Sequence, residues 1–521
     1  MQKSILTSVL MSLTQTRKTA VFLFFGLVGC YLSLSPGSIA GQGYTAEEIN
    51  SGLRILSVAT AWMKGQPVPP MVWSRHGPVP VLFDLPFLKL GKLFVSPDFA
   101  LSFQPVLFTA ALVTILYLWL RKLSSPGIAL LLAFTAAFGT MLWPYAYISL
   151  ETKQSLFLFL AGYLALADGE IRSWPRLLLF AACCGLAITV KSTGIVLFPA
   201  IVYLIYMQFR NDWRSRRAQM VATLLVIVTV WALGHWGSNQ YWGPRGGGAN
   251  SIRIWLIDSP LQLFTNTVGV LGSPTKGLFV YSPVLLLSLY AVPSAFRINR
   301  PIAIFALLVT GCTLAFLSVL RTSVDETWGP RYLHVAIAPL LLCIGCVWSS
   351  FKWRRDLVLV ALALIGLCIS FLGAFYYYGV QNFAAKEVNQ NTMEWMTGDE
   401  DWNQVLFNAR LFRVWFDGKP GPVLWSAKHV WTWAPPADPM EWKSLDLVKY
   451  CQPQSFMVRY WHVPLPGIAR GIFVMYVSSA IIGLMLLAWV TWRTEREYKA
   501  LIAGQLPPQP LAGQPSLMSS S

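Results

Sequence analysis

Long apolar runs separated by short polar stretches dominate the chain. A helix that crosses a bilayer needs roughly 17–25 predominantly apolar residues, and several runs approach that length. The pattern therefore predicts a polytopic helical membrane protein. Twelve candidate spans occur, at about residues 19–35, 101–120, 127–147, 154–167, 177–190, 194–209, 218–236, 278–295, 302–319, 332–348, 357–378 and 468–492.

The charges beside the shorter runs indicate how they fold. As a single helix, the stretch 177–209 would be roughly 50 Å long at 1.5 Å per residue, so it has to be divided. Arginines flank both of its ends, and because Lys and Arg concentrate in cytoplasmic loops, both ends belong inside. Two crossings then place Lys191 at an outer turn. The same argument folds 127–167 into a hairpin with Glu151 and Lys153 at its outer bend.

Applied throughout, this reasoning predicts an all-α polytopic membrane protein with about 12 transmembrane helices and both termini in the cytoplasm. Amphipathic surface helices are expected in the first outer loop, and a small outer segment before the last span. The first apolar run follows Arg17-Lys18 and precedes Ser38-Ile39-Ala40, which is the outline of a cleavable signal peptide. A retained anchor is favoured because the run is long for a signal peptide.

The expected organisation has four parts, and the longer outer segments suggest that the chemistry takes place outside. Internal repeats are not evident, which weighs against an inverted-repeat transporter. The parts are a transmembrane domain (1–378) that includes the first outer loop (36–100), a Trp-rich outer segment (379–467), the last helix with its basic end (468–503), and a disordered tail (504–521).

Composition agrees with a membrane protein and excludes other classes. Only 12% of the residues are charged and 55% are hydrophobic, whereas soluble domains carry about 25% charged residues. A soluble enzyme, a disordered chain and a nucleic-acid module are therefore excluded. The net charge of +17 is explained by basic cytoplasmic loops, without a nucleic-acid partner. Seven of the eight cysteines lie in apolar runs, and no Cys/His spacing typical of a metal site appears.

The first outer loop contains two expected helices and two adjacent acids. Thr45 is a candidate N-cap for a helix from Ala46 to about Met63, with Glu48 three residues later completing a capping box. A second helix is expected from about Pro78 to Leu90. The first is amphipathic and is expected to lie on the outer membrane surface; its apolar face is formed by Ile49, Leu53, Leu56, Val58 and Trp62.

Glu47 and Glu48 are the candidate catalytic residues, and each also has a structural interpretation. Glu48 is as well explained by capping, and Glu47 by the favourable position of an acid at a helix N-terminus. The catalytic alternative is a general base at the water–lipid boundary that removes a proton from an acceptor hydroxyl. One carboxylate suffices for an inverting transfer, because a phosphate leaves without needing an acid.

Several outer-face cations are candidates for holding a phosphate. Arg75 and His76 form a small cluster between two proline breaks, where either a phosphate or a loop carbonyl is a plausible partner. Lys191, Lys276 and Arg331 lie near span ends, where the usual explanation is a side chain reaching for the interface. Lys191 and Arg331 are the stronger candidates, because a guanidinium held by a carboxylate still presents a fork to phosphate.

Three further acids are candidate supporting residues. Asp325 and Glu326 lie in the short outer loop that precedes Arg331. Glu151 lies at a predicted membrane boundary, where it pairs with Lys153, pairs with a neighbouring helix, or acts as a second functional acid. No metal ligand set is expected, although a divalent ion held by acids from distant loops stays open.

The Trp-rich outer segment has two interpretations. Eight tryptophans between positions 395 and 461 are typical of an interfacial belt. Their flat apolar faces are equally suited to stacking on sugars. Composition does not separate the two.

These motifs together resemble the membrane-embedded C-type glycosyltransferases (GT-C), a superfamily that includes protein O-mannosyltransferases, oligosaccharyltransferases and aminoarabinose–lipid A transferases. The resemblance covers the first ten spans. The family acid is most often Asp followed by Glu, whereas this chain has Glu-Glu, which leaves the choice between the two open. The resemblance rests on Glu47 or Glu48, His76–Pro78, Pro144 with Glu151, Lys191, GLFVYSP (277–283) and WGPRYL (328–333).

The resemblance implies sugar transfer from a polyprenyl-phosphate donor to a glycan, lipid or protein acceptor on the outer face of a bacterial inner membrane. The catalytic carboxylate would be Glu47 or Glu48, and some of the outer-face cations would bind the donor phosphate. A polysaccharide polymerase or ligase that uses lipid-linked glycans is one alternative. A transporter is another, although its ionisable groups should lie at the bilayer midplane.

Overall fold

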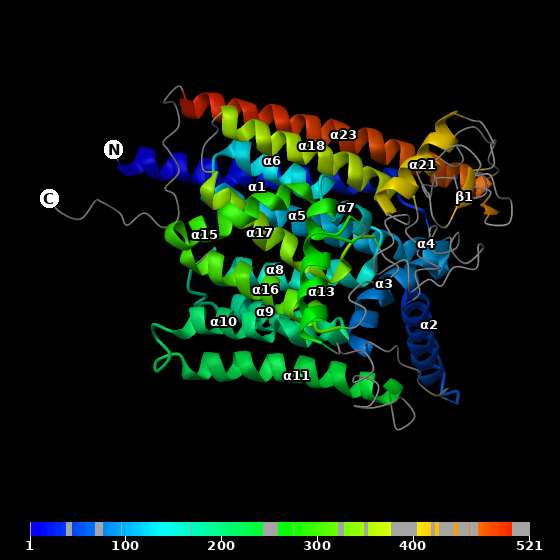
Figure 1. Ribbon diagram of the computed structural model, residues 1–521. Coiled ribbons are helices and arrows are strands. Elements are labelled where there is room, and N and C mark those ends of the chain that lie inside the picture. Colours follow the sequence, from blue (N-terminus) through cyan, green and yellow to red (C-terminus); the bar gives the residue numbers. More distant parts are fainter. Residues whose placement is uncertain are drawn as a thin grey trace.

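Each of the twelve apolar runs contains helix in the computed structural model. The axes of these helices are nearly aligned with one another (Figure 1). The structure describes residues 2–37, 44–67, 77–94, 96–167, 169–242, 259–274, 276–320, 328–348, 353–376, 404–417, 423–426, 442–445, 458 and 467–502.

Eight of the runs form helices without a break. A helix pairs its own backbone groups, so the apolar side of each of these helices that is not covered by protein is suited to face lipid. They are α1 (Gln2–Ser33), α5 (Phe103–Leu123), α8 (Ser149–Leu166), α9 (Trp174–Thr189), α11 (Arg217–Trp242), α16 (Arg300–Ser318), α18 (Trp353–Phe375) and α23 (Gly467–Ile502).

The other four runs are each broken, at the end that the sequence predicts to face outward. In three of them a 3-10 segment joins an α-helix. These runs are α6 (Pro126–Phe138) with α7 (Leu142–Tyr145), η1 (Ser192–Leu197) with α10 (Phe198–Phe209), α14 (Leu278–Tyr281) with η2 (Pro283–Leu287) and α15 (Ser288–Ile298), and η3 (Arg331–Ala336) with α17 (Ile337–Val347). Broken backbone at membrane depth is tolerated only where protein covers it or where it lines a cavity.

The expected helical membrane class is confirmed, while the number of spans stays a prediction. Among the described residues, five helices are long and apolar enough to cross a membrane on their own, and further apolar helices are shorter. The five are Phe99–Leu123, Arg217–His235, Arg300–Ser318, Asp356–Phe375 and Ala469–Ala500.

The first and last helices pack along each other through glycines. A Cβ at Gly29 would lie too close to the carbonyl oxygen of Ser479, and a Cβ at Gly483 would lie 2.8 Å from the backbone nitrogen of Cys30. Small residues at such positions let helix backbones approach closely in a membrane. The start of α1 and the end of α23 consequently lie on the same side of the bundle (Figure 1).

Elements of the first outer loop gather at the opposite end of the bundle, here named the outer end (right in Figure 1). They are α2 (Tyr44–Met63), α3 (Pro78–Phe94) and α4 (Pro97–Leu101). Both predicted helices are therefore present. However, α2 begins at Tyr44, so Thr45 lies in its first turn rather than at the predicted N-cap position. Helix ends vary by one or two residues with the criterion used.

The apolar face of α2 is partly covered by protein. Its Leu53 and Leu56 pack on the buried Leu88 of α3 and Leu101 of α4, in a small cluster separate from the main core. Trp62 and Met63, at the end of α2, are exposed. A surface helix with one end anchored on protein and the other offering apolar side chains fits the predicted position at a membrane surface.

Two helices and two strands of the later outer segments complete this end. Helix α13 (Pro260–Gly272) packs on α16, and α21 (Gln404–Asp417) packs on α18. Strands β1 (Val423–Ser426) and β2 (Trp442–Leu445) form an antiparallel pair in which Val423 faces Leu445. These are the only strands in the part of the chain that the structure describes, and they lie outside the membrane helices.

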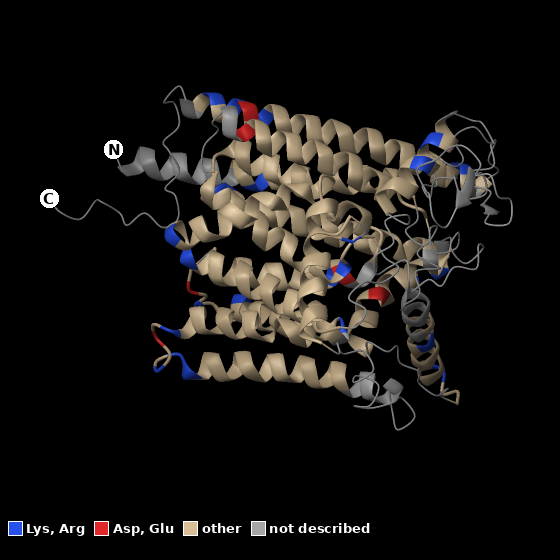
Figure 2. Ribbon diagram, in the orientation of Figure 1, with Lys and Arg blue, Asp and Glu red and all other residues tan. Residues whose placement is uncertain are grey.

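Charged residues separate to the two ends of the bundle. Figure 2 shows Lys and Arg together with several acids at the end opposite the outer end, here named the inner end, further acids and cations near the outer end, and a nearly uncharged stretch between them. At the inner end, Arg121 donates to Glu497 over 2.9 Å, which ties α5 to α23. This separation agrees with the charge pattern from which the topology was predicted.

The glycine contact between α1 and α23 gives a stability prediction. Gly29→Ala should lower stability by about 1–3 kcal/mol, because the added methyl overpacks the interface. Gly311→Ala is the matched control: nothing lies within 4 Å of a Cβ at Gly311, and alanine is favoured over glycine in a helix interior. The midpoint of thermal unfolding in detergent should fall for the first variant and stay constant or rise for the second. Equal midpoints would contradict the packing argument.

Candidate functional site

Three predicted site residues from distant parts of the chain meet at the outer end. The Lys191 Nζ donates to Glu151 Oε1 over 2.7 Å, and Arg331 Nε lies 3.7 Å from the same oxygen. All three side chains are at least nine-tenths buried. The second distance exceeds that of a hydrogen bond, so that contact is mainly electrostatic. We refer to these three residues as the outer ion cluster.

Glu151 is placed by the start of α8. Ile148, the residue before α8, has an extended backbone, and Glu151 lies in the first turn of the helix that follows. An acid is favoured at this position by the helix N-terminus. The entry to α8 is fixed by Tyr145 of α7, whose hydroxyl donates to the Trp328 carbonyl over 2.9 Å. Because Trp328 lies three residues before Arg331, this bond also brings the segment that carries Glu151 close to the segment that carries Arg331.

Lys191 is placed by a tight turn after α9. Its backbone is extended, and its carbonyl accepts a hydrogen bond from the Gly194 N–H over 2.7 Å. A Cβ at Gly194 would lie 2.7 Å from the carbonyl oxygen of Ile188. The turn therefore requires glycine at 194. This confirms the predicted reversal of the chain at Lys191, but the side chain is buried and ion-paired.

Arg331 is placed by Gly329 and Pro330. Gly329 has a φ of +61°, which glycine adopts without strain, and a Cβ there would lie 2.9 Å from the Tyr281 ring. The Tyr281 and Trp328 rings pack edge to face at 5.1 Å. The GLFVYSP and WGPRYL motifs thus form one packing unit that directs η3 toward α8.

A second contact repeats the pairing of α8 with η3. Residues four apart in an α-helix share a face, and residues three apart in a 3-10 helix are eclipsed. Glu151 and Ser155 therefore face Arg331 and His334. The Ser155 hydroxyl lies 2.6 Å from His334 Nδ1. Sequence analysis missed His334, whose position three residues after Arg331 was the available signal.

The outer ion cluster carries more positive than negative charge. A cation within a few ångströms of a carboxylate favours its ionised form, and here two cations share one carboxylate. Removing one partner of such a buried pair leaves an uncompensated charge. With Glu151 ionised, the three groups together carry one positive charge, which makes this region suited to an anion.

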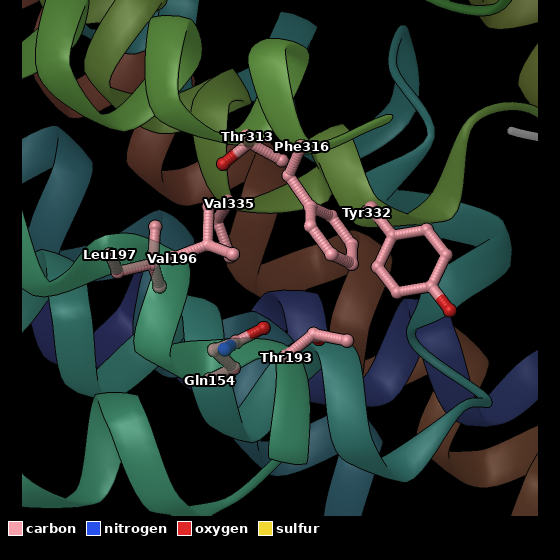
Figure 3. Close-up of a pocket in the computed structure, with 8 residues that line it drawn as sticks. All are labelled: Gln154, Thr193, Val196, Leu197, Thr313, Phe316, Tyr332 and Val335. Atoms are coloured by element: carbon pink, nitrogen blue, oxygen red, sulfur yellow. The ribbon is translucent and has the colours of Figure 1, made fainter. Parts of the chain in front are cut away.

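An aromatic ring connects the cluster to a cavity. Lys191 Nζ lies 4.0 Å and the Arg331 guanidinium 5.0 Å from the Tyr332 ring centroid, within the range of cation–π attraction. Tyr332 also lines a small cavity of about 10 Å³, which is room for about one water molecule. Figure 3 shows its mixed lining of Gln154, Thr193, Val196, Leu197, Thr313, Phe316, Tyr332 and Val335.

Lys276 is buried in a separate contact beside the cluster. Its Nζ donates to Gln404 Oε1 over 3.0 Å. The same oxygen accepts from the Gly329 N–H over 3.3 Å and from the Tyr281 hydroxyl over 3.4 Å. Gln404 belongs to α21, so the later outer segment reaches the motif that carries Arg331. The sequence offered no signal for Gln404, because its partners are far away along the chain.

A fully buried acid–base pair anchors the first outer loop to the bundle. Asp84 of α3 accepts from Lys153 of α8 over 2.5 Å and from Gln104 of α5 over 2.8 Å. The Lys153 ammonium also donates to the Pro80 carbonyl over 3.2 Å. Asp84 was missed, although it is an isolated acid in an apolar stretch. Of the alternatives for Glu151, pairing with Lys153 is wrong, and pairing with a neighbouring helix is confirmed.

The remaining candidates lie outside the residues whose side chains the structure describes. Glu47 and Glu48 fall within the backbone of α2, at the outer end. Arg75 and His76 precede α3, and Asp325 and Glu326 precede Gly329; all four lie outside the described ranges. Their roles stay predictions. Within the described ranges, no three His, Cys, Asp or Glu side chains gather as a metal site would require.

Comparisons with known proteins bear on this arrangement. Residues 81–236 match the family model of dolichyl-phosphate-mannose-protein mannosyltransferases. The expected resemblance to the GT-C superfamily is confirmed. The matched segment contains Glu151 and Lys191 and ends before Arg331. It also contains the missed pair of Asp84 and Lys153.

Other comparisons add little to the family match. An oligosaccharyltransferase from Archaeoglobus fulgidus, solved with a tethered acceptor peptide, is similar over 75% of this chain and 59% of its own, at 11% identity and a TM-score of 0.39. This chain thus aligns with about three fifths of that enzyme. No curated protein matches the sequence.

The Asp84–Lys153 pair gives a prediction on stability. Asp84→Asn should destabilise the protein by about 3–5 kcal/mol, because it leaves the Lys153 ammonium buried without its counter-charge. Asp84→Asn combined with Lys153→Met removes both charges and should restore much of the loss. Thermal unfolding in detergent measures both. The single variant Lys153→Met completes the comparison. If the double variant loses as much unfolding free energy as the two single variants lose together, a direct interaction between Asp84 and Lys153 is contradicted.

Proposed function

We propose that this protein transfers a sugar from a polyprenyl-phosphate donor to an acceptor at the outer end of the bundle. The observation that carries the proposal is the outer ion cluster, in which Lys191 and Arg331 share Glu151. A sugar phosphate diester brings one negative charge, which matches the positive excess of the cluster. The match to mannosyltransferases that use a lipid-phosphate donor supports the same chemistry.

Lys191 and Arg331 act on the phosphate in this proposal. As the bond between the sugar and the phosphate oxygen breaks, the second negative charge develops on the phosphate. Cations already in position stabilise that charge more in the transition state than before it. Before the donor binds, Glu151 holds both cations in place and lowers the free-energy cost of burying them.

The lining of the small cavity beside Tyr332 contacts the part of the donor next to the phosphate once its side chains move to widen it. Its apolar residues, such as Leu197 and Phe316, suit an isoprene unit, and its polar residues, such as Gln154 and Thr193, suit a phosphate or sugar oxygen. The cavity adjoins the cluster through Tyr332, which contacts both cations. The lining and the cluster therefore offer contacts for both parts of a lipid-linked phosphate side by side.

Glu47, or failing that Glu48, is the proposed general base. Removal of a proton from the acceptor hydroxyl lets its oxygen attack the anomeric carbon, while the phosphate leaves from the opposite face. The configuration of the sugar is then inverted. Support comes from the position of α2 at the outer end and from the Asp84–Lys153 pair, which holds the first outer loop against α8 only two residues from Glu151.

The remaining assignments complete the proposal. The outer end faces the periplasm of a bacterial inner membrane, and both termini are cytoplasmic. Arg75 and His76 add to phosphate binding, and Asp325 and Glu326 support Arg331. The donor supplies a hexosyl or pentosyl group, and the acceptor is a glycan, a lipid or a protein.

Binding of undecaprenyl phosphate to the purified protein in nanodiscs tests the role of the cations. Lys191→Gln and Arg331→Gln should each weaken binding by about 10- to 100-fold, because each removes one charge-assisted contact of about 1.5–3 kcal/mol. Lys89→Gln is the matched control, since Lys89 is an exposed cation of α3 at the same end. It should bind as the native protein does.

A second variant separates loss of binding from loss of folding. Glu151→Gln with Lys191→Gln removes one charge of each sign, so the net charge of the outer ion cluster stays at one positive, while Arg331 loses its nearby carboxylate. This variant should still unfold cooperatively, at a midpoint lowered by the unpaired Arg331, and should bind the phosphate lipid weakly. A folded double variant that binds it at native affinity would overturn the proposed phosphate site.

Complementation in the native host tests the proposed base. Strains carrying Glu47→Gln, Glu48→Gln or both should contain normal levels of protein by immunoblot, and the variant of the base should lose one sugar from a surface glycan. Its lipid-linked donor should accumulate, as measured by mass spectrometry, because general-base catalysis contributes about 10²–10⁴-fold to the rate. If the double variant behaves as wild type while gene deletion changes the glycans, the base is misassigned. If deletion changes nothing, the transferase proposal fails.

A further inference from the structure

A second and larger cavity lies at the inner end, away from the outer ion cluster. It has a volume of about 400 Å³ and opens to the surroundings. It is formed where α8 and α10 end and α16 begins (left side of Figure 1). No step of the proposed sugar transfer uses it, and what it binds is therefore a separate question.

Two arginines on different helices dominate its charge. Arg210 follows the end of α10, and Arg300 is the first residue of α16; both are exposed and both line the cavity. Both charges lie close enough to act on the hydroxyl of Tyr203. That hydroxyl donates to the Pro301 carbonyl over 3.3 Å, which fixes α10 against α16.

The rest of the polar lining leaves the positive charge in excess. Glu170 is the acid among the residues of the lining, and it already accepts from Asn211 over 3.0 Å and lies 3.7 Å from Arg172. The N-terminus of α16 adds partial positive charge beside Arg300. The cavity therefore attracts an anion, with Asn211 and Asn299 as neutral hydrogen-bonding groups nearby.

Exposed apolar surfaces lead directly away from both arginines. On α10, Val202 and Tyr206 are 45% and 58% exposed and are spaced four residues apart, in line with Arg210. On α16, Leu307 is 51% exposed, two helical turns from Arg300. Residues at these spacings share one helix face. Each arginine thus stands at the end of an apolar stripe that no described part of the chain covers.

We propose that this cavity binds the headgroup of an anionic phospholipid from the inner leaflet. Its phosphate would contact Arg210 and Arg300, and its acyl chains would lie along the exposed stripes of α10 and α16. Basic pockets between helices on the cytoplasmic side are suited to anionic headgroups. A soluble phosphate would satisfy the arginines but leave the stripes unused, which favours a lipid. This inference does not depend on the proposed transferase activity.

Native mass spectrometry of the detergent-purified full chain tests the proposal. Dioleoyl-phosphatidylglycerol is titrated in, and the fraction of protein with one bound lipid gives the affinity. Arg210→Gln with Arg300→Gln should weaken binding, about fivefold for each arginine. Dioleoyl-phosphatidylcholine should bind more weakly than phosphatidylglycerol to the native protein and should show little difference between native and variant.

Arg214→Gln with Arg217→Gln is the matched control. It removes the same charge from exposed arginines at the same end of the bundle, beside Trp213 and outside the cavity. This control should bind phosphatidylglycerol as the native protein does. Equal weakening in both double variants would mean general electrostatic attraction and would overturn the site. Equal affinity for the two lipids would overturn the preference for an anionic headgroup.

A final arm separates a lipid from a soluble anion. Millimolar inorganic phosphate should not raise the unfolding midpoint of the native protein, whereas phosphatidylglycerol should raise it. The cavity variant should unfold at the native temperature without lipid, because both arginines are exposed, and should lose the lipid-dependent shift. Stabilisation by inorganic phosphate alone would assign the cavity to a soluble anion and overturn the lipid proposal.

Discussion

The ionic contact of Glu151 with Lys191 and Arg331 is the constraint around which the outer end is organised. A buried charge needs a partner, and these three partners come from three separate crossings of the bundle. Each is delivered by a break or a start in a helix: the first turn of α8, the turn at Gly194, and the Gly329–Pro330 step before η3. Unbroken helices would carry these residues along parallel faces and would not bring them to one point. The four broken helical runs are thus connected with the cluster, since irregular backbone and buried charge both require protein around them.

Local rules were sufficient for the helices and for part of the site. Apolar runs and flanking arginines predicted where helices lie, because lipid imposes helical structure on any segment that crosses it. The turn at Lys191 followed from the same charges. In contrast, the partners of Glu151, Lys153 and Lys276 depended on packing between segments far apart in sequence. Lys153 lies only two positions after Glu151 but pairs with Asp84, because residues two apart on a helix do not share a face. No spacing rule connects Gln404 with Lys276 across 128 positions.

The location of the buried charges bears on the competing functions. A transporter places ionisable groups at the midplane of the bilayer, where they form part of an ion or substrate path. Here the stretch between the two ends is nearly uncharged in the described helices (Figure 2). The buried acids and cations instead lie near the two ends, with Asp84, Glu151, Lys153 and Lys191 at the outer end and the Arg121–Glu497 pair at the inner end. This distribution fits the proposed reaction at the membrane surface, with one substrate in the lipid and one in water.

Asp84 extends this argument from binding to catalysis. A general base on a surface helix is useful only when that helix is held at a fixed distance from the phosphate site, since small misplacements of reacting groups lower rates strongly. The bond from Lys153 to Asp84 fixes α3 to α8, and the contact of Leu88 with Leu53 and Leu56 continues the connection to α2. The two acids of α2 are therefore mechanically connected to the helix that carries Glu151. A chain of two buried contacts thus links the proposed base to the proposed phosphate site, although neither Asp84 nor Lys153 needs to touch the substrate.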